Sequence, residues 1–192
     1  GGHLAGHLKK AGATVIGCDV DQERAEAIKE EHGLDMLVHP NEIFDVDCDV
    51  FAPCAMGLAI NETTIDRLKC KVVAGGANNQ LAGDHLGKEL EARGVVYAPD
   101  FVINAGGLIN VYTELEGYNE QRALRLVRNI FYNVQKIYQL ADKHEESSIE
   151  AARIMVGDRL SDIAKIQPHF NRFPARAAIH RQNRTPASSP SR

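Results

Sequence analysis

Short apolar runs alternate with amphipathic stretches along the first hundred residues of the chain. The apolar runs lack the strict alternation of a half-exposed strand and therefore fit strands that are covered on both faces. They predict strands at Thr14–Cys18, Met36–Val38, Val50–Ala52, Val72–Ala74 and Val95–Tyr97. The stretches around and between them predict helices at Leu4–Lys10, Asp21–His32, Glu62–Lys69 and Ala82–Arg93. This alternation predicts an α/β fold with a parallel sheet and helices on both of its faces.

From Gly106 onward the pattern is helical, and no further strand is predicted. The expected helices are Gly107–Leu115, Glu120–Lys143 and Ser148–Ile166. Residues 171–192 contain three prolines, several serines and no apolar periodicity, which is typical of a disordered segment. We therefore expect one domain at residues 1–170, ending in helices, and a basic, disordered tail at residues 171–192.

The start of the chain has the order of a phosphate-binding unit. Gly1 leads directly into a helix, a strand follows, and Asp19 comes about twenty residues after the glycine, as in the second half of a dinucleotide-binding βαβ unit. The first strand and the earlier glycines of such a unit would precede Gly1. We therefore expect an N-terminally truncated chain with a Rossmann-like, doubly wound sheet that lacks its first strand. An ordinary helix start and strand-end acid remain the alternative.

Gly1 and Asp19 together suggest a dinucleotide cofactor. At Gly1 the helix N–H groups and the positive helix end would face a pyrophosphate. Asp19 would accept hydrogen bonds from ribose hydroxyls and repel a 2′-phosphate, which favours NAD over NADP.

Three loops that follow predicted strands carry small or amide side chains. The first contains Cys54 and Ala55, the second Ala77, Asn78 and Asn79. In the third loop, Asn104 precedes two glycines. Small residues at strand ends let a flat ligand approach, and amides suit a carboxamide or ribose hydroxyls. Each loop alone is ordinary turn chemistry, but the three together predict a cofactor-binding edge.

Composition and charge narrow the function classes. The net charge is −4, and the five Arg of residues 171–192, which contain no acidic residue, leave −9 on residues 1–170. An acidic body argues against nucleic acid as a partner. No apolar run reaches the roughly 20 residues that span a bilayer, so no membrane association is expected. The four cysteines form no C-x-x-C pair, which predicts free thiols in a reducing cytoplasm rather than zinc ligands or a disulfide framework.

Two further groups resemble metal ligands by spacing alone. His3 and His7 lie one helical turn apart, and Asp45, Asp47 and Asp49 alternate before a predicted strand. No third ligand is placed beside the histidines, and the aspartates fit a solvated loop. No metal is therefore expected.

Several segments resemble a known family. They are GGHLAGHLKKAGATVIGCDVD, CDVFAPCAMG, KVVAGGANNQLA, GVVYAPDFVINAGGLINVYTELEGYN and AARIMVGDRLSDI, which follow one another from residue 1 to about residue 170. The chain resembles the C-terminal coenzyme domain of the glutamate/leucine/phenylalanine/valine dehydrogenase family, and within that family it is most similar to the leucine and valine dehydrogenases.

The resemblance implies roles for particular residues. Gly1 matches the third fingerprint glycine and Asp19 the ribose-binding acid. The positions that line the adenosine, ribose and nicotinamide are matched by Cys54, Ala55, Ala77, Asn78, Asn79 and Asn104. Leu108 and Val111 match positions that border the pocket for the substrate side chain. No catalytic residue is assigned, because the family's catalytic lysine and aspartate lie in an N-terminal domain that would precede Gly1.

The resemblance also implies an activity. The expected function is the coenzyme-binding part of an NAD-dependent L-amino-acid dehydrogenase, which deaminates branched-chain amino acids to 2-oxo acids and ammonia in their catabolism. The full-length enzyme would be a homo-oligomer, and this chain alone would be inactive. The alternatives are a non-catalytic nucleotide-binding module or an inactive fragment. A tetrahydrofolate- or malic-type dehydrogenase domain would share the fold but not the FAPCA and VINAGG loops.

Overall fold

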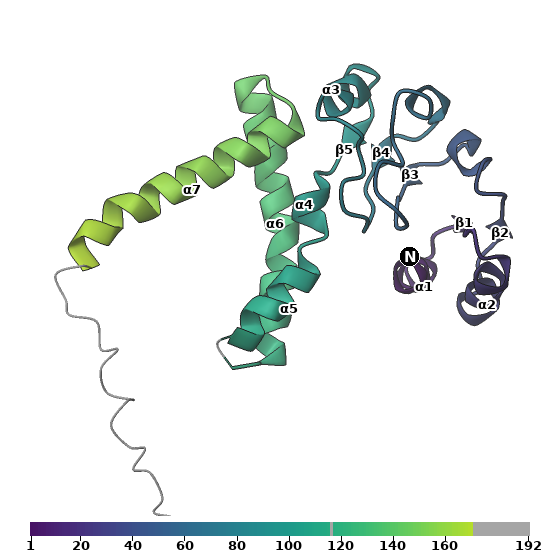
Figure 1. The fold of residues 1–192 in the computed structure, drawn as a ribbon, viewed down its shortest axis with the longest axis horizontal. Helices are drawn as coiled ribbons and strands as arrows, with labels where there is room; N and C mark the ends of the chain where they lie inside the picture. The colour runs from purple at the N-terminus through teal and green to yellow at the C-terminus, as the bar shows by residue number, and fades with distance from the viewer. Residues whose placement is uncertain (116, 171–192) are drawn as a thin grey trace, which may run out of the picture. The chain divides into compact units, whose positions relative to one another are not determined.

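The fold is mixed α/β with parallel strands (Figure 1), seen in a computed structural model that describes residues 1–115 and 117–170. The strands are β1 Ile16–Gly17, β2 Met36–Leu37, β3 Val50–Phe51, β4 Val72–Val73 and β5 Val96–Tyr97. The helices are α1 Gly2–Lys10, α2 Gln22–His32, α3 His85–Ala92, α4 Asp100–Ile103, α5 Gly106–Leu115, α6 Glu120–His144 and α7 Ser148–Phe170. Two 3-10 turns, η1 Ile43–Asp45 and η2 Ile65–Arg67, lie between strands.

The strands form two parallel sheets. β1 pairs with β2, and β3, β4 and β5 follow one another in a three-stranded sheet. In the larger sheet Val50 lies opposite Val72, and Val72 opposite Val96. Each of the five predicted strands is present, shortened to two residues, so the parallel α/β prediction is confirmed.

Side-chain caps explain where two of the helices begin. Asp21 accepts a hydrogen bond from Arg24 N–H at 3.1 Å at the start of α2, and Gly33, whose φ of 68° is left-handed, caps its C-terminal end. In α6, Asn119 accepts from Arg122 N–H at 2.9 Å. Both helices therefore start at a residue type that is disfavoured inside a helix but favoured at its N-terminal end.

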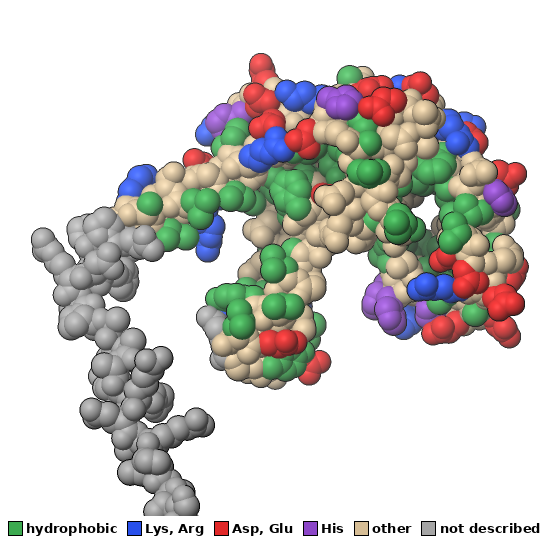
Figure 2. Space-filling model, in the orientation of Figure 1, with side chains coloured by type: hydrophobic (Ala, Val, Ile, Leu, Met, Phe, Trp, Pro, Cys, Tyr) green, Lys and Arg blue, Asp and Glu red, His purple; other side chains and the backbone are tan. Residues whose placement is uncertain are grey.

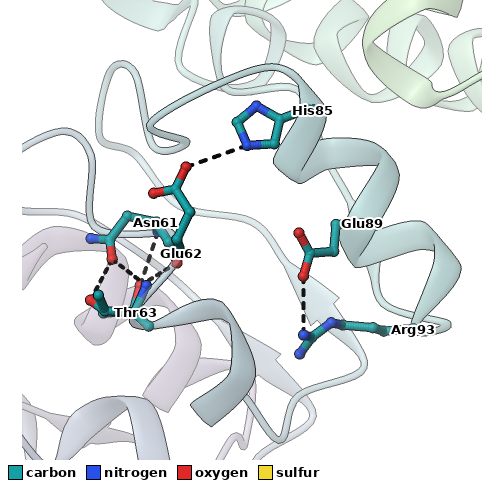
Figure 3. Close-up of polar contacts among 7 residues, drawn as sticks. Asn61, Glu62, Thr63, His85, Glu89 and Arg93 are labelled. Atoms are coloured by element: carbon teal, nitrogen blue, oxygen red, sulfur yellow. Dashed lines mark hydrogen bonds and ion pairs between the residues drawn. The ribbon is translucent and has the colours of Figure 1, made fainter.

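The helix predicted at Glu62–Lys69 is wrong. Only a single 3-10 turn, η2, forms there. Asn61 Oδ1 accepts from both the N–H and the hydroxyl of Thr63 (Figure 3). Thr64 Oγ1 accepts from Asn61 N–H and donates to Ala59 O. These local bonds compete with helical hydrogen bonding.

Two more differences concern segments predicted as loops. α4 forms one short helical turn at Asp100–Ile103, and η1 includes Asp45. Asp45 forms an ion pair with Arg67 at 2.7 Å, which holds the pKa of the Asp45 carboxyl below its usual value. The aspartate is thus exposed but tied to η2, rather than part of a free loop.

The core lies against the three-stranded sheet. Its buried members come from β4, β5, α3, η2, the start of α7 and the loops next to these elements, with Cys48 and Phe51 packed beside them. They are Ile60, Ile65, Cys70, Val73, Leu86, Leu90, Val95, Tyr97 and Ile149. The core therefore fixes β3, β4 and β5, whose carboxyl ends lead into the predicted cofactor loops.

The chain divides into two compact units, Gly1–Arg153 and Ile154–Arg192. The first unit contains both sheets and helices α1 to α6. The tail expected to be disordered, residues 171–192, lies outside the described residues. Within the described part, no helix has the length and apolar character needed to cross a membrane.

Candidate functional site

The loops that follow β3 and β4 meet at one edge of the sheet. Ala77 N–H donates to Pro53 O at 2.9 Å, and Gly76 N–H donates to the Cys54 Sγ at 3.4 Å. Gly75 is buried so closely against Pro53 that a Cβ at this position would collide with the Pro53 backbone. A glycine is therefore required for the two strand ends to come together.

The start of α1 reaches the same edge (Figure 1). A Cβ built on Gly1 would lie 3.4 Å from the Cβ of Cys54. The first hydrogen bond within α1 runs from Ala5 N–H to Gly1 O at 2.9 Å, so the N–H groups before Ala5 have no partner inside the helix. Unpaired N–H groups at the positive end of a helix form a place where an anion can bind.

Two of the predicted amide side chains contact one another across loops. Asn104, at the end of α4, donates from Nδ2 to Asn78 Oδ1 at 2.6 Å and to Ala77 O at 3.4 Å. Within the described residues, this leaves Asn78 Nδ2 as a donor and Asn104 Oδ1 as an acceptor for a ligand. The pair therefore offers both kinds of uncharged hydrogen-bonding group at one place.

A buried network that the sequence reasoning missed supports this pair. Gln80 is fully buried and donates from Nε2 to Gly75 O at 2.6 Å and to Ala77 O at 3.1 Å. Asp100, also buried, accepts from Gln80 N–H at 2.8 Å and from Phe101 N–H at 2.7 Å. The network ties the loop after β4 to the start of α4. Its sequence signal is an acid directly after Pro99, where a helix can begin.

Tyr97 lies beside this network. Its hydroxyl oxygen accepts from Asp100 N–H at 3.4 Å. Burial, and secondly the charge of Asp100, raise the pKa of the Tyr97 hydroxyl far above its usual value. Tyr97 is therefore a neutral packing residue at any physiological pH.

The remaining predicted cofactor residues lie in loops that follow β1, β3 and β4. Asp19 follows β1, is half-buried, and accepts from Asp21 N–H at 3.1 Å through Oδ1. Ala55 is exposed next to Cys54. Asn79 is exposed with a φ of 51°, and its carbonyl accepts from Leu58 N–H at 2.6 Å. Asn79 thus contributes through its backbone to joining two loops.

Leu108 and Val111 lie one turn apart on α5. Their exposed fractions are 74% and 54%, and Figure 2 shows hydrophobic side chains gathered over this helix. They form an apolar surface that a nonpolar side chain could cover.

Other charged side chains form ion pairs with one another. Asp49 forms an ion pair with Lys71 at 2.7 Å, which lowers the pKa of the carboxyl. Glu62, in the turn before η2, pairs with His85 at the start of α3 at 3.4 Å, and Glu89 in α3 pairs with Arg93 just after the helix (Figure 3). Among the described residues no group of three or more His, Cys, Asp or Glu side chains could hold a metal.

Comparison with known proteins places the chain in a family. The family model of glutamate/leucine/phenylalanine/valine dehydrogenase matches residues 6–167. A leucine dehydrogenase from Thermoactinomyces intermedius is 48% identical over 167 residues, which cover 87% of this chain and 45% of that protein. A phenylalanine dehydrogenase from Caldalkalibacillus thermarum is 42% identical over 172 residues, covering 88% and 46%.

Solved structures agree with the sequence comparison. The crystal structure of L-tryptophan dehydrogenase from Nostoc punctiforme matches with a TM-score of 0.80 and 41% identity, covering 83% of this chain and 48% of that one. The hetero-hexameric glutamate dehydrogenase from Thermus thermophilus shares the fold, with a TM-score of 0.67 at 19% identity over 87% of this chain and 45% of that one. The chain thus spans about half the length of the relatives it matches. It belongs to the glutamate/leucine/phenylalanine/valine dehydrogenase family.

Proposed function

We propose that this chain is the coenzyme-binding part of an NAD-dependent amino-acid dehydrogenase. The observation that carries the proposal is the meeting of the α1 start, Cys54, Gly76 and the Asn78–Asn104 pair at the carboxyl edge of parallel strands. In doubly wound sheets this edge is where dinucleotides bind. A Rossmann-like arrangement of the two sheets, with the dinucleotide crossing between them, is part of the same proposal.

Each part of the dinucleotide has a matching group. The N–H groups before Ala5 suit the pyrophosphate, and the Asp19 carboxylate suits the two ribose hydroxyls. Asn78 Nδ2 and Asn104 Oδ1 complement a carboxamide, which has one acceptor and one donor. Gly1 and Gly76 leave the approach free of side chains, as a close pyrophosphate contact requires.

In the proposed reaction, NAD⁺ supplies the hydride acceptor for oxidation of an L-amino acid at its Cα. Hydrolysis of the resulting imino acid gives a 2-oxo acid and ammonia. The residues of this chain bind and orient the coenzyme, and we assign no acid or base of the reaction to them.

Titration with NADH and NADPH tests the coenzyme proposal. NADH is expected to bind more tightly, because Asp19 would repel a 2′-phosphate. Asp19→Ala should weaken NADH binding by about 1–3 kcal/mol, the range of hydrogen bonds to charged groups. Glu30→Ala, which removes an exposed acid from α2, serves as the control and should leave the Kd unchanged. Equal affinity for NADH and NADPH would contradict the role of Asp19.

We further propose a branched aliphatic L-amino acid as substrate. Leu108 and Val111 support this, because they present an exposed apolar surface on one side of α5. The bulk of Leu108 should also shorten the pocket against an aromatic ring. A methylene in such a pocket contributes about 1–3 kcal/mol, so leucine, isoleucine and valine should differ only modestly.

Values of kcat/KM for leucine, valine, phenylalanine and glutamate, measured on the complete protein, test this proposal. Leucine or valine should give the highest value, and Leu108→Ala should shift the preference toward larger side chains. A clear preference for phenylalanine or glutamate would contradict it. Coenzyme binding without turnover of any amino acid would instead favour a non-catalytic nucleotide-binding module.

A further inference from the structure

The register of the larger sheet places two cysteines opposite one another. Val50 pairs with Val72, Phe51 with Val73, and Asp47 with Lys69 in an isolated parallel bridge. Partners in all three pairs are 22 positions apart in the sequence. Cys48 and Cys70 have the same separation and lie between these pairs, so they face each other where β3 and β4 begin.

The spacing of neighbouring strands suits a covalent link between these residues. Adjacent strands lie about 4.8 Å apart, and the Cα atoms of a disulfide lie about 4.4–6.8 Å apart. Cys70 is buried in the core, 7% exposed, and Cys48 packs against the same core cluster. Both thiols therefore lie on the same face of the sheet.

The electrostatics of the two thiols agree with this proximity. Burial raises the pKa of both, and a charge on Cys70 raises the pKa of Cys48 further. The neighbouring Asp47 and Asp49 act in the same direction on Cys48. At neutral pH the two cysteines are thus protonated thiols, which react slowly, and in the structure all four cysteines are free.

We propose that Cys48 and Cys70 form an intramolecular disulfide when the protein meets a peroxide. Cys48, the more exposed of the two, is oxidised first to a sulfenic acid, with release of one water. The sulfur of Cys70 then displaces the hydroxyl group from Cys48, forming the S–S bond and a second water. In total, two thiols and one hydrogen peroxide give one disulfide and two waters.

The position of the bond determines its effect. It would join β3 to β4 at their amino ends, whereas Cys54 and Gly76 follow the carboxyl ends. The link should leave the candidate cofactor edge open. It should also stabilise the protein, because it restricts the unfolded chain between residues 48 and 70.

Peptide mapping under non-reducing conditions tests the proposal. The folded protein is treated with hydrogen peroxide, remaining thiols are blocked with iodoacetamide, and the product is cut with trypsin and a protease that cleaves beside acidic residues. Asp49 separates Cys48 from Cys54, so the two cysteines fall in different peptides. We expect a cross-linked Cys48–Cys70 peptide that dithiothreitol releases, and a Tm higher by roughly 5 °C.

Two variants provide the controls. Cys18→Ala should keep both the cross-link and the rise in Tm, whereas Cys48→Ala should lose both. Cys48→Ser replaces Cys48→Ala if circular dichroism shows that the alanine variant does not fold. Recovery of Cys48 and Cys70 as separately blocked or separately oxidised residues would overturn the proposal. So would a cross-link from Cys70 to Cys54 or Cys18 in the folded protein.

Discussion

At the scale of single residues, buried polar side chains hold the candidate site together. Gln80 and Asp100 are both buried, and the bond from Gln80 N–H to the Asp100 carboxylate joins the loop after β4 to α4. Two further bonds of Gln80 stay within that loop, and one of Asp100 stays within α4. Burying such groups is favourable only when they are hydrogen-bonded. Their contribution to the site is therefore to fix the backbone that carries Asn78 and Asn104.

Removing the Gln80 amide should destabilise the protein. Gln80→Leu removes the Nε2 hydrogen bonds to the carbonyls of Gly75 and Ala77, at a cost of about 1–3 kcal/mol. Guanidinium denaturation measures this change, with Gln139→Leu on the exposed side of α6 as the control. If the two variants have the same free energy of unfolding as the wild type, the network does not hold the loop.

A second residue, Asp35, should make stability depend on pH. Its carboxylate accepts from Lys9 Nζ and from Val15 N–H, both at 2.7 Å, and these bonds lower its pKa, with that from Lys9 the larger cause. A carboxyl whose pKa is lower in the folded state stabilises the protein above its unfolded pKa and loses this effect as the pH falls through the folded value.

Asp35→Asn therefore should be less stable than the wild type at pH 7, and the difference should shrink at pH 3 and below. Denaturation of both proteins at several pH values measures the difference. A gap that stays constant from pH 7 to pH 2 would show that the Asp35 charge contributes nothing.

At the scale of elements, the sequence predicts the strands better than the connections. Flat apolar runs such as Val72–Ala74 have no stable alternative to burial, so the strands form where expected, although shorter. The Glu62–Lys69 helix fails because Asn61 and Thr64 bond to the nearby backbone.

Only part of the candidate site, likewise, can be predicted from the sequence. Strand-end loops with glycines and amides predict that Asn78 and Asn104 lie near a ligand, and the structure brings these two side chains together. The hydrogen bond from Gln80 to Asp100 joins residues 20 positions apart, so no short-range sequence pattern predicts it. Such contacts depend on how strands and helices pack.

The junction of β3 and β4 should depend on one glycine. Gly75→Ala places a methyl group against the Pro53 backbone, which cannot move aside as a flexible side chain would. We expect a loss of about 3 kcal/mol or more, with weaker NADH binding. Gly157→Ala is the control, because nothing lies near that Cβ in α7 and alanine favours helix. Equal stability of the two variants would contradict the tight contact.

At the scale of the whole molecule, the core and the candidate site lie in the first compact unit, Gly1–Arg153. The unit combines parallel strands, whose carboxyl ends face one edge, with a helix start that reaches the same edge. Membership of the amino-acid dehydrogenase family and this arrangement lead to the same proposal, a dinucleotide held across the strand ends.

A crystal structure of the protein grown with NAD⁺ tests this central proposal most directly. We expect density for the pyrophosphate at the start of α1, for the adenosine ribose beside Asp19, and for the nicotinamide near Asn78 and Asn104. Density for NAD⁺ at any other surface, with this edge empty, would contradict it.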